Sequence, residues 1–248
     1  MNQGKLILPV VMGLMSLDVF CGAAHAQVYS SNIVGYIIQD LLPGNNLIAN
    51  QLGNGDNTLN TIFNAASTLN KAIPEGTTFT KWDASLVQFL PLSTYDTNGG
   101  WSINYEFGYG EGGELNSPSS FTNVFIGSVW PGANIGGPYS PPLVTGSGLM
   151  LLSCYAPFGG ATFYDVVGRD PNNGESVTTL DALSQTTATT TFENGFWSNG
   201  DPALAVGQSA FFNLVSVPEP ASWALLGAGL FLFSNVRRKR GLVKIFGK

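Results

Sequence analysis

Four acidic residues gather around aromatic residues in the middle of the chain, a combination that could do chemistry on sugars. The acids are Asp96, Glu106, Glu111 and Glu114, and the aromatic residues among them are Trp101, Tyr105 and Tyr109. Glycoside hydrolysis needs two carboxyl groups a defined distance apart across a cleft. Exposed Trp and Tyr rings offer flat faces on which a sugar ring can stack. The cluster raises two hypotheses, a carboxylate-dependent glycoside hydrolase and a carbohydrate-binding surface module.

A second copy of this segment bears on the role of the acids. TYDTNGGWS at 94–102 recurs as TFENGFWS at 191–198, and GEGGELN at 110–116 recurs as GQSAFFN at 207–213, both about 97 positions later. Gln208 and Phe211 stand in the second copy where Glu111 and Glu114 stand in the first. We therefore predict that the acids are tolerated at surface positions and that the chain has no catalytic residues.

The two tryptophans of the repeat, Trp101 and Trp197, have two open interpretations. Both copies keep them, which favours packing in a core. A sugar-stacking role on an exposed sheet face is the alternative.

The chain around these residues shows many short runs of β-branched and aromatic residues, separated by Gly, Asn, Pro and Asp, which is typical of an all-β fold. The strands predicted are 31–38, 45–52, 77–83, 122–129, 148–155, 187–193 and 209–215. A short helical turn is predicted at 57–65. We expect two degenerate repeats, about 45–129 and about 147–216, packed as a β-sandwich or barrel-like domain.

Two short motifs resemble ligand-binding loops. Residues 108–113 (GYGEGG) match G-x-G-x-x-G, but no helical pattern follows, and the motif is meaningful only between a strand and a helix. Residues 170–175 (DPNNGE) resemble part of a calcium loop, but the glycine is one place early and Asp181 stands where a glutamate is needed. We expect a glycine-rich loop at the first and a turn at the second, where weak calcium binding stays open.

The chain has one histidine, His25, and two cysteines, Cys21 and Cys154. His25 falls in the segment predicted below to be removed, which excludes a Ser-His-Asp triad, a Cys-His pair and an imidazole-ligated zinc site from the mature chain. We predict no metal site and no cofactor. Cys154 stands in an apolar setting, so we expect it to be buried as a small hydrophobic residue.

Charge excludes one class of partner. Between residues 27 and 217 there are three basic and fourteen acidic residues, a net charge of minus eleven. Nucleic-acid binding rests on clustered Lys and Arg. We therefore predict no nucleic-acid partner.

The N-terminus has the three regions of a secretory signal peptide. Lys5 precedes an apolar stretch, and Ala24 and Ala26 form a small-x-small cleavage site, so residues 1–26 are predicted to be removed by the export machinery and the mature chain to begin at Gln27. A lipidated Cys21 is disfavoured because the bulky Phe20 precedes it, and an uncleaved anchor is disfavoured by the Ala-x-Ala site.

The C-terminus has three parts in order: Val-Pro-Glu-Pro at 217–220, an apolar run at 221–236 and four basic residues. Residues 221–233 are apolar on every side, so the run at 221–236 predicts a single, marginally long membrane helix. The basic residues, which resist translocation and act as a membrane stop, are Arg237, Arg238, Lys239 and Arg240.

This arrangement resembles the PEP-CTERM sorting tail of bacterial surface proteins, here over residues 217–240. The resemblance implies that an exosortase-type processing enzyme recognises Pro218, Glu219 and Pro220. The basic extension at 241–248 departs from the family pattern, which usually ends sooner. The body also resembles an uncharacterised group of such proteins, through VYSSNIVGY at 28–36, LIANQL at 47–52 and YDTNGGW at 95–101.

The sequence therefore predicts an exported β-rich domain at 27–216, anchored in the membrane before processing and located at the cell envelope or surface. We expect a structural or binding role in the envelope or extracellular matrix, with extracellular polysaccharide as a partner to be tested. The carbohydrate-binding module is the alternative, followed by the hydrolase.

Overall fold

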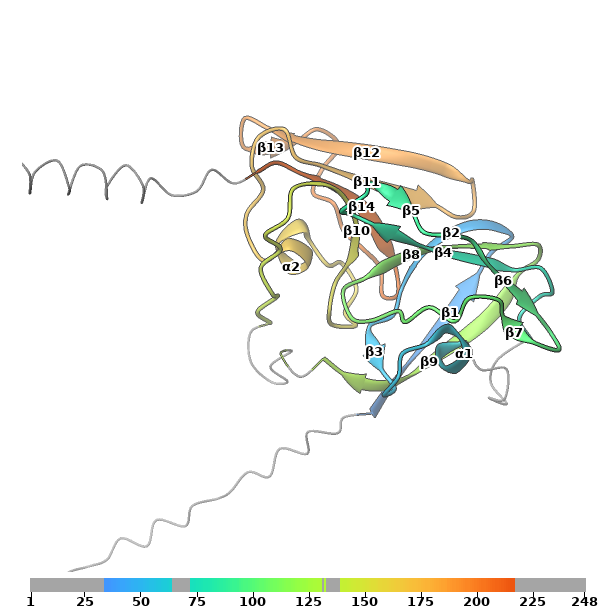
Figure 1. The fold of residues 1–248 in the computed structure, drawn as a ribbon. Coiled ribbons are helices and arrows are strands. Elements are labelled where there is room, and N and C mark those ends of the chain that lie inside the picture. Colours follow the sequence, from blue (N-terminus) through green and yellow to red (C-terminus); the bar gives the residue numbers. More distant parts are fainter. Residues whose placement is uncertain (1–33, 64–71, 131, 133–138, 217–248) are drawn as a thin grey trace, which may run out of the picture. The chain divides into compact units, whose positions relative to one another are not determined.

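The computed structural model describes residues 34–63, 72–130, 132 and 139–216. Antiparallel strands in three sheets form the framework of this part, with two helices of one turn or little more, as Figure 1 shows. The all-β prediction is confirmed. The predicted signal peptide, sorting tail and C-terminal extension lie outside the described residues.

The first sheet has three strands in the order β1-β9-β3. Its strands are β1 (Val34–Leu41), β9 (Phe121–Val129) and β3 (Leu52–Gly53). Side chains alternate along β1: Ile37 and Leu41 are buried, while Tyr36 and Ile38 are exposed. Period-two alternation of this kind forms a sheet with one face on the core and the other in solvent.

The second sheet has six strands, in the order β2-β8-β4-β6-β7 with β5 beside β4. The strands are β2 (Gly44–Ala49), β4 (Thr78–Asp83), β5 (Gln88–Phe89), β6 (Ser93–Asp96), β7 (Gly100–Trp101) and β8 (Gly112–Ser117). The turn between β6 and β7 is held by the Asp96 carboxylate, which accepts hydrogen bonds from the N–H groups of Asn98 and Gly99. An acidic side chain that bonds the backbone two or three residues on is typical of such turns.

The third sheet has five strands in the order β10-β14-β11-β12-β13. They are β10 (Gly148–Ser153), β11 (Ser176–Asp181), β12 (Thr186–Glu193), β13 (Phe196–Trp197) and β14 (Ser209–Leu214). The strand order is that of the second sheet, with β10, β14, β11, β12 and β13 in the places of β2, β8, β4, β6 and β7.

The registers of the two sheets correspond residue by residue. Ser93 lies opposite Phe79 and Thr190 opposite Val177, and Trp101 and Trp197 take equivalent places opposite Tyr95 and Phe192. Turn hydrogen bonds repeat as well, since Ser102 Oγ accepts from Thr94 N–H and Ser198 Oγ from Thr191 N–H. The strand pairings and turn hydrogen bonds therefore recur at the same spacing as the repeat in the sequence.

The two repeats contact each other reciprocally. Ala49, at the end of β2, donates its N–H to Gly207 O at 2.8 Å, and Ser153, at the end of β10, donates to Gly110 O at 3.0 Å. Ala49 corresponds to Ser153, and Gly110 to Gly207. Reciprocal pairing of equivalent residues is the mark of a two-fold relation, so the repeats pack as a pseudo-symmetric pair within one chain.

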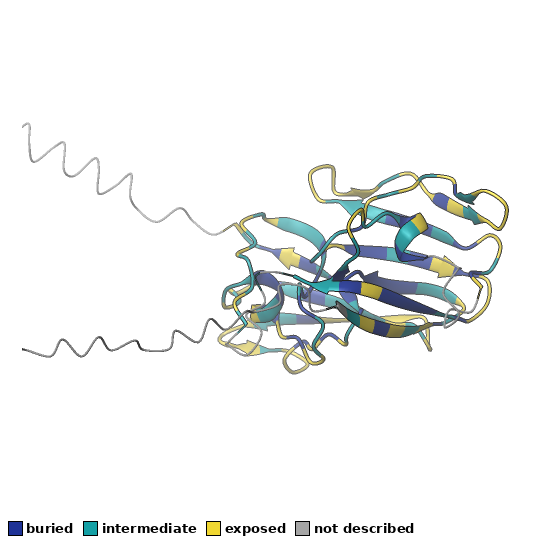
Figure 2. Cartoon of the chain, turned by 90° about the horizontal axis from the view of Figure 1, so that it is seen from below, coloured by how far each residue is buried: buried dark blue, intermediate teal, exposed yellow. Residues whose placement is uncertain are grey.

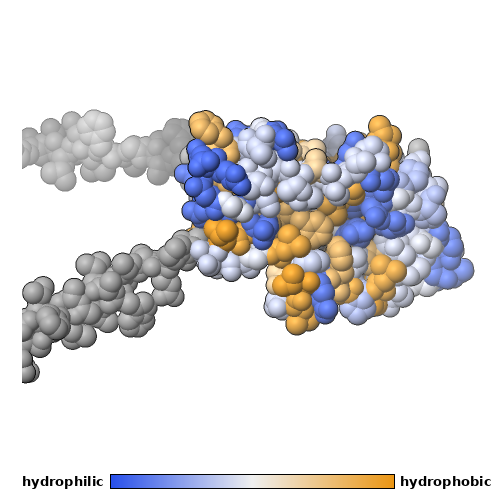
Figure 3. All heavy atoms as spheres, turned by 90° about the horizontal axis from the view of Figure 1, so that it is seen from above, coloured by the Kyte–Doolittle hydropathy of each residue, from blue (hydrophilic) through white to orange (hydrophobic). Residues whose placement is uncertain are grey.

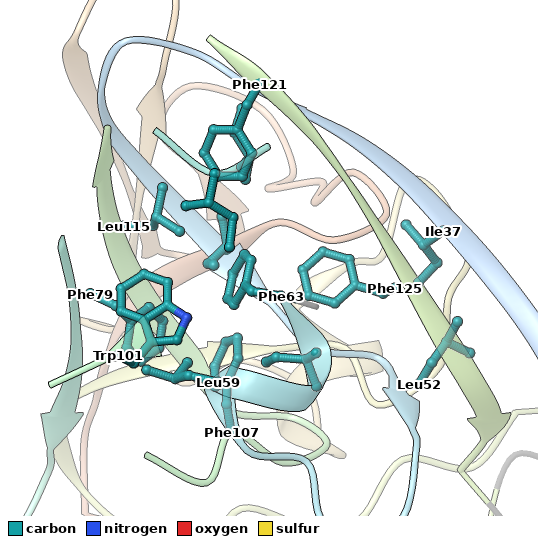
Figure 4. Packing of buried hydrophobic residues seen from close by; sticks show 14 residues of the cluster. Ile37, Leu52, Leu59, Phe63, Phe79, Trp101, Phe107, Leu115, Phe121 and Phe125 are labelled. Carbon is teal, nitrogen blue, oxygen red and sulfur yellow. The ribbon is translucent and has the colours of Figure 1, made fainter. Parts of the chain in front are cut away.

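The largest core cluster lies between the first and second sheets. Ile37 and Phe125 come from the first, while Phe79 and Leu115 come from the second, with Trp101 among them, as Figure 4 shows. A second cluster packs β10, β11 and β14 against a helix and the loop after residue 139. Figure 2 shows buried residues along the paired strands and exposed ones mainly at turns.

The helices occupy equivalent places in the two repeats. α1 (Leu59–Ile62) falls inside the turn predicted at 57–65. α2 (Phe163–Val167) was not predicted, although its ends carry clear signals: Thr162 and Asp165 form a capping box, and Gly168 ends the helix with φ of 80°. Both features stabilise a short helix against fraying.

Candidate functional site

The acids of the central cluster are mostly engaged in the fold. Asp96 holds the β6–β7 turn, and Glu111 accepts from Lys81 Nζ and from Gly108 N–H, each at 2.8 Å. Glu114 lies half-buried within β8, where burial raises the pKa of its carboxyl group. Gln208 makes the same turn contact in the second repeat as Glu111 makes in the first, since it accepts from Ala205 N–H. This shared role explains why an amide can replace the acid.

The aromatic residues of that cluster are also used in the fold. Trp101 is 5% exposed and packs on Phe63, Phe79 and Tyr95. Tyr105 Oη donates to Pro91 O, and Tyr109 Oη donates to Ser128 O. The core interpretation of Trp101 is therefore confirmed.

The glycine motif at 108–113 is a turn that leads into a strand. Glu111 donates its N–H to Gly108 O, and Gly110 takes a positive φ of 73°. β8 follows directly, with no helix. The predicted glycine-rich loop is confirmed.

The stretch at 170–175 is a turn held together by its last residue. Glu175 is fully buried, and its carboxylate accepts from Arg169 twice and from the N–H groups of Asn172 and Val215. The turn interpretation holds, and the Glu175 carboxylate faces inward rather than toward a calcium ion.

Cys154 is buried, as predicted. Its Sγ lies 3.5 Å from Tyr139 Oη, and burial raises the pKa of the thiol. A protonated thiol is a poor nucleophile, so Cys154 serves the second core cluster.

The structure instead reveals an aromatic groove in the second repeat, between α2 and the β12–β13 hairpin. It has a volume of about 490 Å³, within the range of small-molecule sites. The residues that line the aromatic groove are Thr162, Phe163, Tyr164, Asp170, Pro171, Phe192, Trp197, Asp201 and Pro202.

Rings form one wall of the aromatic groove. Trp197 packs against Phe163 at 5.5 Å and Phe192 at 5.3 Å between ring centroids. These contacts hold the half-buried indole in place. Tyr164, on α2, is 47% exposed and has no ring contact within the described residues. A fixed indole beside a free phenol gives a flat apolar surface with a polar edge.

Two carboxylates stand beside the rings. Asp170 and Asp201 are exposed, and within the described part of the chain neither carboxylate accepts a hydrogen bond. Among the described residues, no Lys, Arg or His lines the aromatic groove. The nearby Arg169 guanidinium packs on the Phe163 ring at 5.8 Å and is paired with Glu175. The groove therefore offers hydrogen-bond acceptors and negative charge.

The equivalent place in the first repeat is closed. Asn60 stands where Tyr164 stands in the second repeat, and Asn60 Oδ1 accepts from Trp101 N–H at 3.1 Å. Asn60 N–H donates to Asn104 Oδ1 at 2.9 Å, and Asn104 corresponds to Asp201. These two asparagines tie α1 to the hairpin and leave Trp101 buried. The second repeat lacks both ties, so its groove is open.

The sequence did not single out Tyr164 or Asp201. The available signal lay in the comparison of the copies, where Asn60 and Asn104 are exchanged for these two residues. The predicted site residues themselves, the signal cleavage alanines, Pro218 to Pro220 and the basic stop, lie outside the described residues.

Two negative findings apply to the described residues. No three His, Cys, Asp or Glu side chains among them are grouped closely enough to hold a metal ion. No described helix is long and apolar enough to cross a membrane.

Comparison with known families gives one match. Residues 216–239 match the PEP-CTERM protein-sorting motif. This range includes Pro218, Glu219 and Pro220 and ends one residue before Arg240. The match supports an exported protein that is sorted by an exosortase-type enzyme at the cell envelope. No curated protein and no solved structure matches the chain.

Proposed function

We propose that the protein is a surface or matrix component whose β domain binds extracellular glycan after export. The sorting motif supports the location. The observation that carries the binding role is the aromatic groove, which is open in one repeat and closed by Asn60 and Asn104 in the other.

The chemistry of the groove suits a neutral or amino sugar. A sugar ring can stack on the face of Trp197 or Tyr164 while its hydroxyl groups donate to Asp170 and Asp201. An anionic polysaccharide would meet two uncompensated carboxylates, and like charges placed together are unfavourable. The groove thus selects by charge as well as by shape.

We further propose that the domain has no catalytic activity. Asp96, Glu111 and Glu175 are engaged in turns and ion pairs. Asp170 and Asp201 are exposed to solvent, whereas a carboxyl group that acts as a general acid is typically held in an apolar pocket. Binding without turnover is the role these positions support.

The test is a glycan array probed with the purified chain, carrying neutral, amino and anionic glycans. We expect a neutral or amino glycan to bind, and Tyr164→Ala to weaken binding about tenfold, equivalent to about 1.4 kcal/mol. Tyr36→Ala is the matched control, because Tyr36 is 70% exposed on β1 in the first sheet. Absence of any bound glycan, or equal binding by the Tyr164→Ala variant, would contradict the proposal.

A further inference from the structure

β12 (Thr186–Glu193) has an open edge. β11 pairs with its whole length. On the other side β13 pairs only with Phe192 and Glu193, and Ser198 and Asn199 make hydrogen bonds to Thr191, Thr190 and Thr189. Figure 1 shows β12 at the margin of its sheet. Thr186 to Thr189 are exposed. Residues 186–189 therefore form an edge that another strand could join, whereas Thr190 is buried and its Oγ1 accepts from Asn199 N–H.

The direction of the free backbone groups follows from the hydrogen bonds of the neighbouring residues. Phe192 bonds Gly174 and Glu175 on the β11 side, and Thr191 bonds Ser198 on the other. Peptide groups alternate in direction along a strand, so the groups of Thr187 and Thr189 point outward. Of these, only Thr189 O has a partner among the described residues, the side chain of Asn199 at 3.0 Å.

This edge lacks the devices by which proteins usually protect an edge strand. Residues 186–190 read Thr-Thr-Ala-Thr-Thr, with no charge, proline or glycine. The first repeat has Pro91 where the second has Ala188, and there the strand is broken into β5 and β6. Proline, charged side chains and interruptions block pairing at edges, so one repeat is protected and the other is not.

We propose that β12 pairs antiparallel with β12 of a second copy of this chain, about a two-fold axis at Ala188. Residues 186–190 are a palindrome about Ala188, so this register places Thr187 opposite Thr189 of the second copy. The N–H and C=O groups of Thr187 and Thr189 then bond reciprocally. Threonine pairs across strands are favourable.

Charge favours this edge over other surfaces for contact between copies. The body carries fourteen acidic residues against three basic ones, so most faces of two copies repel each other. The edge at 186–189 is neutral, and the register places Glu193 opposite Leu183, not opposite an acid. Figure 3, from the side on which β12 lies in Figure 1, shows hydrophobic patches between hydrophilic residues on this face.

A cysteine placed on the axis tests the register. In this register Ala188 lies opposite Ala188 of the second copy in a non-hydrogen-bonded pair. The Cα atoms of such a pair lie about 4.5 Å apart, within the range of a disulfide. We expect Ala188→Cys to form a disulfide-linked dimer in the chain isolated from the host envelope. Leu183→Cys, 82% exposed on the adjoining turn, should cross-link at least about tenfold less. Peptide mass mapping identifies the bridge, since Cys154 is buried.

Proline variants test the hydrogen bonds. In the Ala188→Cys background, Thr189→Pro removes an outward N–H but no bond to β11, so cross-linking should fall at least about tenfold. Leu92→Pro makes the same change at the equivalent position of the first repeat and should leave cross-linking unchanged. If Thr189→Pro lowers thermal stability, the double change Thr187→Asp and Thr189→Asp replaces it.

Equal cross-linking by Ala188→Cys and Leu183→Cys would overturn the proposal. Cross-linking of Ala188→Cys that survives both Thr189→Pro and the double change to Asp would also overturn it. It does not depend on glycan binding, because the edge shares no tested residue with the groove. A chain that dimerises without binding glycan would overturn the proposed function alone.

Discussion

Arg169 and Glu175 form a largely buried ion pair with two contacts, Nη2 to Oε1 at 2.5 Å and Nη1 to Oε2 at 2.8 Å. Glu175 is fully buried, and it also accepts from Val215 N–H at 3.0 Å. Val215 directly precedes the residues that match the sorting motif. The pair therefore fixes the last described strand at the point where the sorting segment begins.

Loss of this pair should destabilise the domain strongly. Glu175→Gln leaves the Arg169 charge without its partner, and breaking a buried pair costs about 3–5 kcal/mol. Glu111→Gln is the matched control, because the Glu111 side chain is 46% exposed and an exposed pair contributes about 0–1 kcal/mol. Urea unfolding followed by tryptophan fluorescence measures both. Equal costs would show that the Arg169 pair is not structurally important.

The same ion pair predicts that the thermal stability of the domain depends on pH. Burial alone would raise the pKa of Glu175, but hydrogen bonds from Arg169, Asn172 and Val215 outweigh it and hold the pKa below its ordinary value. A lowered pKa contributes stability above the unfolded-state pKa of about 4.3, and this is lost as pH falls through the folded-state pKa. We expect thermal stability to fall below about pH 4, and to fall less in the Glu175→Gln variant. Parallel pH profiles for both chains would contradict this.

The equivalent tryptophans should differ in their effect on stability. Trp101→Ala removes a buried ring from the main core, which costs about 3–5 kcal/mol. Trp197→Ala removes a half-buried ring and should cost at least about 1 kcal/mol less. Denaturant midpoints of the two variants measure the difference. Equal midpoints would mean that the aromatic groove is as closed as its counterpart.

How far the sequence predicts this structure depends on the segment. Strands predicted at 77–83, 122–129 and 209–215 agree with β4, β9 and β14 to within one residue at each end, because each is rich in β-branched and aromatic residues. β8 was missed because GGELNS is rich in Gly and polar residues, although Leu115 is buried in the core. Pairing with β2 and β4 decides its structure, which no local pattern shows.

The aromatic groove was missed for a different reason. Burial of Trp101 and partial exposure of Trp197 depend on Asn60 and its counterpart Tyr164, which are far from them in the sequence. The repeat showed that the tryptophans correspond. The repeat did not show which of the two tryptophans a neighbouring helix would cover.

Cys154 should be unreactive in the folded chain. Burial raises the pKa of its thiol, so little thiolate exists at neutral pH, and the thiolate is the reactive form. We expect negligible reaction with Ellman's reagent in the native state and full reaction in denaturant. Rapid labelling of the native chain would place the thiol at the surface.

The predicted signal peptide should be absent from the exported protein. N-terminal sequencing of the envelope-associated chain should begin at Gln27, because Ala24 and Ala26 form the cleavage site. A chain that keeps residue 1 and fractionates with the cytosol would contradict export.

The central claim, that this chain is sorted through its PEP-CTERM segment, is tested most directly by the mass of the cell-associated protein in its native host. Pro218, Glu219 and Pro220 are replaced together by alanine. Proline fixes φ and lacks an N–H, so the native segment resists both helix and sheet. We predict that the native chain is cleaved and has lost Arg237 to Arg240, whereas the triple variant is exported but keeps them. Identical masses, with the basic residues retained in both, would contradict the account.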